Sequence, residues 1–469
     1  MKKIKIAYIG GGSKQWARVF MNDLALSKNI TGEIGLYDID IEAAIRNQKI
    51  GNYINQNPNT ISKWNYVVYK ELKDALTSAD FVVMSILPAT FKEMASDVHA
   101  PEKYGIYQAV GDTVGPGGIL RAMRTVPLYE GFAKAIKEYC PDAWVINFTN
   151  PMSICTKTLY DVYPEIKAFG CCHEVFHAQD FLCLVLHEEM GIERPNRKEI
   201  YTDACGINHF TWITEAYYKD INILSYLPGF IKKYYNEGYY ERIGADKDAF
   251  KRDCFAYGNK VKMDLFNKYH CLAAAGDRHL VEFLNNSWYL NDKTDPEKWL
   301  YQLTTVDYRV NQCNKLIEES NLMASGEKPV IVQKSDEEAV DLIEALLGFK
   351  TIVTNVNYPN KGQMSQLPIN SIVETNCVFT NNSLKPITSK ELPIDVLNLV
   401  SRNNTNIETS YLGIKNRDLN MIFNSFINQP LTSSLTYSDG LKLFKEMINN
   451  TYEYLSPFFP NLDKFLNNK

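Results

Sequence analysis

Short apolar runs alternate with segments of helical spacing through the first two hundred residues. Residues 4–9 form a run of apolar and β-branched side chains, a glycine-rich turn interrupts it, and residues 16–26 carry apolar positions at helical spacing. Further apolar runs follow at residues 34–37, 79–86, 143–148 and 166–169, with helical segments between them. Strands that alternate with helices predict an α/β fold with a doubly wound, Rossmann-like parallel sheet.

The pattern changes in the second part of the chain. Residues 201–208 indicate one more strand, and beyond about residue 215 the chain is rich in Tyr and Lys and has mainly helical spacing. Turns and strands are indicated again at 355–362 and 371–375. We therefore expect a Rossmann-like domain over residues 1–200 and a mixed α+β domain over residues 201–469.

Composition narrows the class of protein. Of the 469 residues, 45% are hydrophobic and 22% charged, as in soluble globular proteins. A net charge of −5 gives no global attraction for nucleic acid or an anionic membrane. No secretory signal is evident, and no apolar run approaches the ~18 residues of a membrane helix. We expect a cytoplasmic protein whose ten cysteines are reduced packing residues.

The glycine-rich turn is a candidate dinucleotide site. Gly10, Gly12 and Ser13 lie between a strand and a helix, where backbone N–H groups can face a pyrophosphate. The third glycine of the usual pattern would fall at Gln15, so a plain structural turn is the alternative. Asp38 ends the second strand, where a carboxylate favours NAD over NADP, although it could also cap the next helix.

Two more segments could serve a ligand. Asn150 follows the strand at 143–148 and could hold the nicotinamide ribose or a substrate hydroxyl, or cap a helix that starts at Pro151. A Gly- and Pro-rich loop at 111–118 precedes a helix that carries Arg121 and Arg124. Arginines three residues apart can clamp a carboxylate, or they can form a solvated basic face.

Reactive side chains gather directly after the strand at 166–169. Cys172, His173 and Glu174 are consecutive, and His209 follows 37 residues after Cys172. Both are expected at successive strand-to-helix junctions, so Cys172 and His209 can meet above the sheet edge. They could hold a divalent ion with open positions for substrate oxygens. A buried thiol and a satisfied core histidine are the alternative reading.

Taken together and in order, these motifs resemble family 4 of the glycoside hydrolases over roughly residues 4–375. The resemblance rests on Gly10 to Ser13, Leu36 to Asp40, Gly111 to Arg124, Asn147 to Met152, Gly170 to His173, Gly206 to His209 and Asn357 to Gly362. It implies NAD and a divalent metal, usually Mn²⁺, a reducing environment, a dehydrogenase-like C-terminal half, and a homodimer or homotetramer. Family 4 lies outside the two-carboxylate scheme of most glycosidases.

The resemblance also implies roles for single residues. Cys172 and His209 match the family's metal ligands. In the family's reaction NAD⁺ oxidises the sugar at C3, a base removes the C2 proton, the C1 substituent leaves, water adds, and NADH returns the hydride. Asp277 matches the base, with Tyr257, Tyr269 and His279 as alternatives and a helix cap as its structural reading. Asp112 resembles the acid that protonates the leaving group.

The segment Cys172 to Val175 resembles the α-galacturonidase clade of that family. This implies an α-glycoside substrate that is a uronide, with His173 and Glu174 facing the sugar. Glu174 could orient His173, bind a hydroxyl or repel a 6-phosphate. A uronate needs a cation, for which the candidates are Arg124, Arg278, Arg121 and Lys14. The alternative functions are an α-glucosidase or α-galactosidase, a sugar dehydrogenase, and an NAD-binding sensor.

Overall fold

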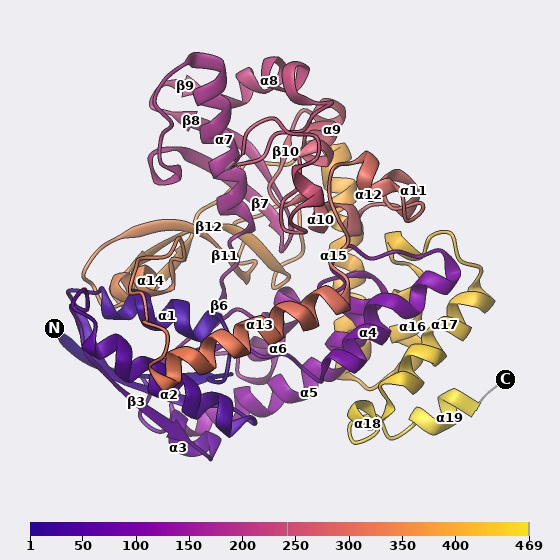
Figure 1. Ribbon diagram of the computed structural model, residues 1–469. Helices are drawn as coiled ribbons and strands as arrows, with labels where there is room; N and C mark the ends of the chain where they lie inside the picture. The colour runs from indigo at the N-terminus through magenta and orange to yellow at the C-terminus, as the bar shows by residue number, and fades with distance from the viewer. Residues whose placement is uncertain (242, 468–469) are drawn as a thin grey trace.

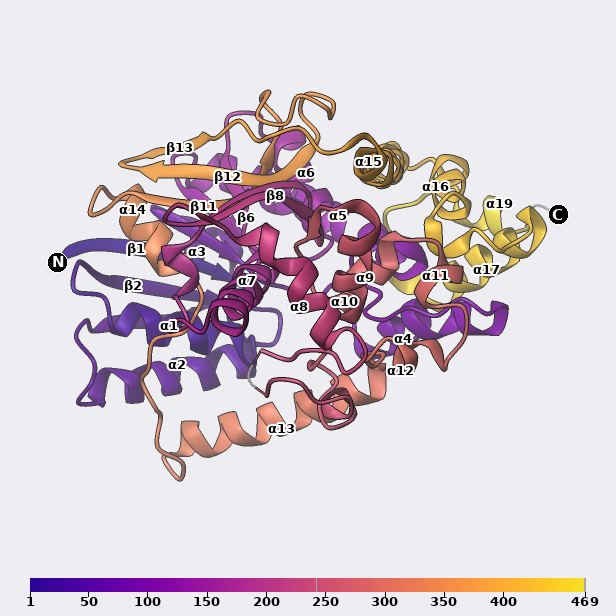
Figure 2. The ribbon, with the colours of Figure 1, turned by 90° about the horizontal axis from the view of Figure 1, so that it is seen from above.

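One large sheet runs through the whole molecule. The computed structural model describes residues 1–241 and 243–467 and contains a 13-stranded sheet (Figures 1 and 2). The strands are β1 (Lys2–Ile9), β2 (Ile30–Tyr37), β3 (Trp64–Tyr69), β4 (Phe81–Met84), β5 (Trp144–Asn147), β6 (Lys167–Gly170), β7 (Tyr201–Ile207), β8 (Phe210–Tyr218), β9 (Ile221–Asn222), β10 (Leu272–Ala273), β11 (Ile352–Pro359), β12 (Ile372–Thr380) and β13 (Ser383–Pro386).

The first six strands confirm the expected doubly wound sheet. They are parallel and lie in the order β3-β2-β1-β4-β5-β6. Strands β2 and β3 are added on one side of β1 and strands β4 to β6 on the other, so the topological switch point lies between β1 and β4. Side chains of β1 alternate between two cores: Ile6 and Tyr8 face one, and Ala7 and Ile9 the other. Both faces are therefore covered, which explains why these strands are almost continuously apolar.

Helices cover both faces of this parallel half. The helices of the first two hundred residues are α1 (Trp16–Ala25), α2 (Ile41–Gln56), α3 (Leu72–Leu76), α4 (Phe91–His99), α5 (Gly115–Tyr139), α6 (Met152–Val162) and α7 (Glu174–Met190), of which α7 packs against segments of the second half. The helices α1 and α2 pack on one face, and α3, α5 and α6 on the other. The α5 helix begins already at Gly115, so only the first residues of the predicted loop are irregular.

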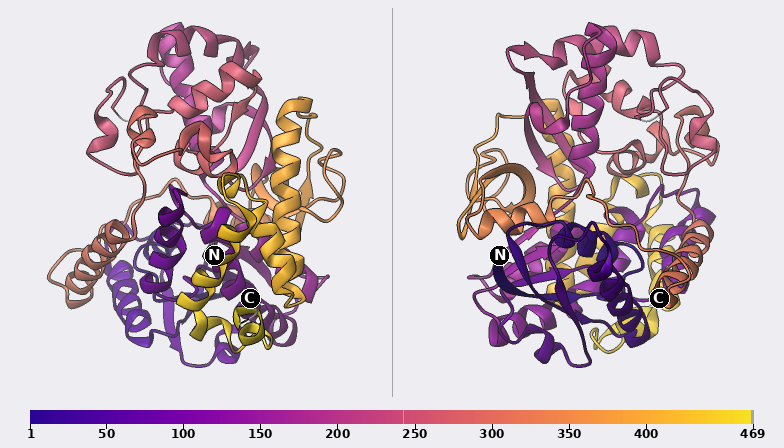
Figure 3. Two further views of the ribbon diagram at one scale, coloured as in Figure 1. Left: turned by 90° about the vertical axis from the view of Figure 1, so that its right-hand side faces the viewer. Right: turned by 60° about the vertical axis from the view of Figure 1, so that its left-hand side comes forward.

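The second half is mixed α+β, as expected. Its helices are α8 (Leu227–Tyr234), α9 (Lys260–Tyr269), α10 (Asp277–Leu280), α11 (Asn286–Tyr289), α12 (Asp295–Lys298), α13 (Val306–Ser325), α14 (Ala339–Leu346), α15 (Ile394–Lys415), α16 (Leu419–Ile427), α17 (Tyr437–Asn450), α18 (Tyr452–Leu455) and α19 (Leu462–Asn467). Figure 3 shows two lobes, with the magenta and red segments above the indigo parallel half.

The two halves share secondary structure across residue 200. Strand β11 pairs antiparallel with β6, and the sheet continues through β12, β7 and β8 to β10. Helix α14 packs in the same apolar core as α1 and α2, and α13 packs against α2 and α4 (Figure 1). The chain therefore crosses between its halves several times.

One local expectation was wrong. His209 does not lie at a strand-to-helix junction, because β7 and β8 form an antiparallel hairpin with Asn208 and His209 as its two-residue turn. His209, the second residue of this turn, has a φ of 62°, in the left-handed region. The turn projects from the sheet beyond β7, so His209 still reaches the edge at which β6 ends.

All ten cysteines are free, as expected. No helix among the described residues combines the length and the apolar character needed to cross a membrane.

Candidate active site

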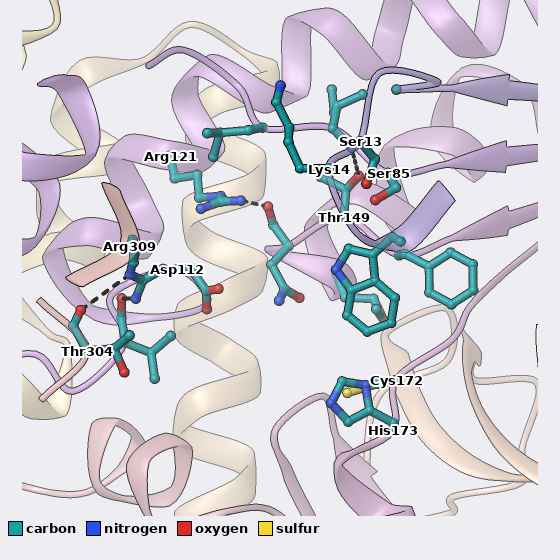
Figure 4. A pocket seen from close by; sticks show the side chains of 18 of the residues that line it. Ser13, Lys14, Ser85, Asp112, Arg121, Thr149, Cys172, His173, Thr304 and Arg309 are labelled. Carbon is teal, nitrogen blue, oxygen red and sulfur yellow. Dashed lines mark hydrogen bonds between the residues drawn. The ribbon is translucent and has the colours of Figure 1, made fainter. Parts of the chain in front are cut away.

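A deep cavity of about 1330 Å³ lies at the carboxyl ends of the parallel strands. It is lined from both halves of the chain, by the glycine turn after β1, the residues after β5 and β6, the β7–β8 turn and residues from 240–241 and 253–257. This is the edge of an open α/β sheet at which ligands bind. Figure 4 shows Ser13 and Lys14 at one end of the cavity and Cys172 and His173 at another.

The glycine turn makes a close backbone cradle. Gly10 has a φ of 94°, and a Cβ atom there would lie 2.0 Å from the Ser85 carbonyl oxygen. A Cβ on Gly12 would lie 2.8 Å from the Asp38 carboxylate, which accepts the Gly12 N–H at 2.8 Å. Gly10 and Gly12 thus allow the close backbone approach, although the third glycine of the usual pattern is replaced by Gln15, immediately before α1. Asp38 lines the cavity, and Asp40 rather than Asp38 caps α2.

Asn150 faces the same cavity between the cradle and the second half of the chain. Its backbone carbonyl accepts the Arg121 Nε–H at 3.0 Å, and its side-chain Oδ1 has no hydrogen-bond partner among the described residues. Pro151, and not Asn150, occupies the N-cap position of α6. Asn150 therefore offers a free amide to a ligand instead of capping a helix.

Candidate metal ligands lie at the other end of the cavity. Cys172, two residues after β6, and His209 both line it, and the Asn208 amide lies beside the Cys172 thiol. Neither atom of that buried amide has a hydrogen-bond partner in the described structure. Burial raises the pKa of the Cys172 thiol well above its usual value, and the charges of Glu374 and Glu174 add to the shift. A soft thiolate ligand, an imidazole and an unsatisfied amide suit a divalent cation.

A short relay orients His209. The Thr113 hydroxyl donates to Asp112 Oδ1 at 2.8 Å and lies 2.8 Å from His209 Nδ1. Because Thr113 has only one hydroxyl hydrogen and an ionised carboxylate can only accept, Nδ1 of His209 must donate to Thr113. We infer that Nε2 of His209 keeps the lone pair that a metal ion needs.

His279 completes this end of the cavity. Its ring lies 3.9 Å from the His209 ring, centroid to centroid, and one ligand atom each of Asp112, His209 and His279 lie within 4.8 Å of one another. Burial and the neighbouring His209 lower the pKa of His279 to about 3, so it is neutral at neutral pH. It is a third candidate ligand or a hydrogen-bonding group beside the metal.

Glu174 joins the two halves of the chain at the cavity wall. Its Oε2 accepts the Gly276 N–H at 2.6 Å, and its Oε1 lies 3.7 Å from His279 Nε2. Burial alone would raise the pKa of Glu174, but His279, His173 and His177 hold it well below the usual range. The carboxylate is therefore fixed and ionised. His173 also lines the cavity, with its ring 5.7 Å from that of Trp16.

Asp277 does not line the cavity. Its carboxylate accepts the backbone N–H groups of Val261 at 3.2 Å and Lys262 at 3.1 Å, so it caps α9 from outside that helix. Burial raises the pKa of Asp277 to about 6, although the Lys262 charge opposes the shift. The structure thus places the expected base in the structural role that was its alternative. Of the other base candidates, Tyr257 and His279 line the cavity and Tyr269 does not.

Only one of the two arginines expected to form a clamp lines the cavity. Arg121 lines the cavity, whereas Arg124, one helical turn further along α5, turns away and forms a buried two-pronged ion pair with Asp97 of α4. Both side chains of that pair are 3% exposed. The guanidinium of Arg124 is therefore occupied by a protein carboxylate. Arg278 lines the cavity as expected.

Removal of the Arg124 side chain tests this structural role. We expect Arg124→Ala to lower the free energy of unfolding by about 3–5 kcal/mol, because it leaves the Asp97 charge buried and unpaired. Urea unfolding would measure the change. Arg194→Ala is the matched control, since its pair with Asp180 is exposed and contributes at most about 1 kcal/mol. Equal losses in the two variants would contradict the assignment.

Several residues of the site carry no local sequence signal. Arg309 of α13 lines the cavity, and Thr113 links Asp112 to His209. Glu374 lies buried beside Cys172 and accepts hydrogen bonds from Thr211, Asn355 and Asn357. Only the three-dimensional path of the chain brings them to the site, so a pattern search over neighbouring positions could not have found them.

The arrangement combines a dinucleotide cradle with a metal-binding cluster in one cavity. An anionic group, Asp112, lies between Arg121 and the paired histidines. Burial alone would raise the pKa of Asp112, but the charge of Arg121, with that of Arg309, holds it far below the usual range. Such a site can oxidise a bound alcohol and move protons at neighbouring carbons.

Comparison with known proteins agrees with this architecture. An α-galacturonidase from Thermoanaerobacterium saccharolyticum is 48% identical over 452 residues, 96% of each chain, and relatives from three other bacteria at 44–49% identity carry the same name. The crystal structure of Bacillus subtilis LplD, named as a glucosidase candidate, superposes with a TM-score of 0.90 at 44% identity, covering 95% of this chain and 100% of that one.

A more distant structure shares the fold. A 6-phospho-α-glucosidase from gut microorganisms, solved with NAD and Mn²⁺, has a TM-score of 0.75 at 17% identity and covers 97% of this chain and 99% of its own. The model of the family 4 glycosyl hydrolases matches residues 5–188, and the model of their C-terminal domain matches residues 204–432. The chain therefore belongs to family 4 of the glycosyl hydrolases.

Proposed function

We propose that this glycosidase removes terminal α-linked galacturonate residues from glycosides. The main support is the cavity itself, in which a dinucleotide cradle, a metal-type cluster and three arginines face one space. The name shared by relatives at 44–49% identity supports the choice of sugar. An α-glucosidase or α-galactosidase of the same family is the second candidate, because a more distant relative, 28% identical, is an α-galactosidase.

The residues present fit both expected cofactors. Gly10, Gly12, Ser13 and Asp38 would hold NAD, with Asn150 near its nicotinamide ribose. Gly10 and Gly12 have no room for a Cβ atom, and Asp38 and Asn150 line the cavity. Cys172 and His209 would hold a divalent metal, with Mn²⁺ as the expected ion. When bound, the cofactor supplies reversible hydride transfer at the sugar and the metal supplies polarisation of the sugar oxygens.

The chain's own residues must then move a proton. Asp112 is the carboxylate best placed for this, because it lies beside His209 and His279 and lines the cavity. Arg121 keeps it ionised, so Asp112 enters the reaction ready to accept a proton. If it also protonates the leaving group, as the family resemblance suggests, the proton it donates is one that it accepted earlier in the same turnover.

The decisive experiment is a panel of aryl α-glycosides assayed with NAD⁺, Mn²⁺ and a thiol reductant. We expect galacturonate release from the α-galacturonide and no net accumulation of NADH. Cleavage of the α-glucoside or α-galactoside with none of the α-galacturonide would reject the uronide. Net NADH formation would indicate a sugar dehydrogenase, and NAD binding without turnover of any glycoside would indicate a sensor.

Asp277→Asn separates the base from the helix cap. Since Asp277 caps α9 and lies outside the cavity, we expect this variant to lose about 1–3 kcal/mol of stability, because its carboxylate no longer balances Lys262. We expect kcat to change by less than ~10-fold, whereas loss of a general base costs about 10²–10⁴-fold. Steady-state kinetics and thermal unfolding measure the two effects. A kcat loss in the range of a base would restore Asp277 to that role.

The assembly is part of the same proposal. Homodimers or homotetramers are expected from the family resemblance, and light scattering coupled to gel filtration would measure the mass directly. A monomer of 53.7 kDa at assay concentration would reject the expectation.

A further inference from the structure

The cavity wall carries both acidic and basic side chains. Lys14, Arg121, Arg278 and Arg309 all line it. Lys14 pairs with Asp40, 3.9 Å away at the cradle end. Arg121 donates to the Asn150 carbonyl, and its charge acts on Asp112. In the part of the chain that the structure describes, Arg278 and Arg309 have no ion-pair partner.

These two arginines are anchored to the same residue. Arg278 Nη1 donates to the Thr304 hydroxyl at 2.5 Å, and Arg309 Nε donates to the Thr304 carbonyl at 3.3 Å. Arg309 Nη2 also donates to the Val110 carbonyl at 2.5 Å. Every one of these hydrogen-bond acceptors is neutral. The charges of Asp112 and Glu282 act on Arg309 from beyond ion-pair distance. Figure 4 shows Arg309 and Thr304 on the side of the cavity where Asp112 lies.

Arg278 is rigid and incompletely satisfied. Its side chain is 7% exposed, its guanidinium lies 4.6 Å from the centre of the Phe255 ring, and its Nε has no hydrogen-bond partner within the described residues. A buried, unpaired guanidinium is costly unless a ligand supplies the missing charge and acceptors. Stacking on an aromatic face fixes its plane in advance, which suits a planar, two-oxygen anion.

The position of Arg278 suits an anion carried by the sugar and not an anion carried by the cofactor. Arg278 precedes His279, whose ring lies against that of His209 in the metal-type cluster. The dinucleotide cradle is at another end of the cavity, where Lys14 already has its acid. An anion beside Arg278 is therefore attached to the molecule that the cluster holds.

We propose that Arg278 and Arg309, jointly fixed by Thr304, bind the substrate's C6 carboxylate and set the preference for uronides over neutral hexosides. This rests on the proposed function. It also narrows the four basic candidates of the sequence to Arg278 and adds Arg309, which no sequence pattern indicated.

The test compares two substrates that differ only at C6. The kcat/KM for an aryl α-galacturonide should fall roughly 30- to several-thousand-fold in Arg278→Gln, the range for truncating one partner of a buried charge pair. The kcat/KM for the matching aryl α-galactoside should change less than ~3-fold, because that sugar has no carboxylate. Arg309→Gln should shift the ratio in the same direction. Arg194→Gln, which removes an exposed arginine outside the cavity, should leave both values unchanged.

The outcomes separate the two proposals. If the wild type does not cleave the galacturonide, the proposed function and this inference both fail. If the wild type cleaves it but the Arg278→Gln and Arg309→Gln variants lose activity on both substrates equally, or keep the wild-type ratio of kcat/KM values, only this inference is overturned.

Thermal unfolding shows whether each variant is folded. Arg278→Lys keeps the charge but loses the two-pronged guanidinium. If Arg278→Gln does not fold, Arg278→Lys replaces it, and we expect an intermediate ratio of the kcat/KM values for the two substrates. Free galacturonate should inhibit the wild type more strongly than galactose does, and that difference should disappear in the variants.

Discussion

Cys172→Ala is expected to reduce glycoside turnover on the order of 10³-fold or more. The Cys172 thiol is the soft ligand of the candidate metal site that includes the His209 imidazole, and a metal that polarises the sugar oxygens contributes several kcal/mol to lowering the barrier. The wild-type unfolding temperature should rise with Mn²⁺ concentration, since binding to the folded state alone stabilises it. In Cys172→Ala that rise should disappear, whereas stabilisation by NAD⁺ should remain.

Cys171→Ala is the matched control for this prediction. Cys171 is the neighbouring buried thiol, and it packs in the apolar core shared by α1, α2 and α14. Its removal should cost stability, as any loss of core volume does, but should leave the response to Mn²⁺ in place. A Cys172→Ala variant that retained both turnover and the Mn²⁺ response would mean that the thiol is only a packing residue.

Asp112→Asn is expected to lower kcat about 10²–10⁴-fold with little change in NAD⁺ affinity. The amide cannot accept a proton from the sugar, and loss of a general base or acid has this magnitude. The amide also changes the relay through Thr113, because its Nδ2 donates where the carboxylate could only accept. Stopped-flow measurement of the first turnover, compared with the steady state, would show that the lost step is chemical.

Thr113→Val distinguishes the two effects of Asp112. It removes the hydroxyl between Asp112 and His209 but keeps the carboxylate, so it should weaken metal binding about 10–100-fold, as loss of an outer partner of a ligand does. Saturating Mn²⁺ should then restore most of its turnover, whereas it should not restore turnover in Asp112→Asn. If saturating metal rescues Asp112→Asn fully, Asp112 only positions His209 and moves no proton.

The parallel half was predictable because its signals are local. Apolar runs, a glycine turn and Asp38 each depend on a few neighbouring residues, and the parallel direction of the strands follows from their alternation with helices. The position of β11 and β12 between β6 and β7 was not predictable, because antiparallel pairing between strands some two hundred residues apart leaves no mark on either strand.

The same limit applies to the site. Cys172 and Asp38 lie at strand ends, so the sequence indicated their location correctly. Asp277 and Arg124 have the right residue types close to the cavity in sequence, but buried partners turn them away from it, Lys262 and α9 in one case and Asp97 in the other. Burial and partners of a side chain are set by packing between distant segments, which the order of residues near Asp277 or Arg124 does not reveal.

The sheet that joins the two halves also constrains the order in which the protein can be made. The free edge of β6 remains without its neighbour β11 until the ribosome has added more than 180 further residues. At typical rates of synthesis this takes roughly 10–40 s. During that time an apolar strand edge next to Cys172 is open to pairing with other nascent chains. We therefore expect the yield of folded enzyme to fall steeply as expression rate or temperature rises, and to recover with chaperones that bind such edges.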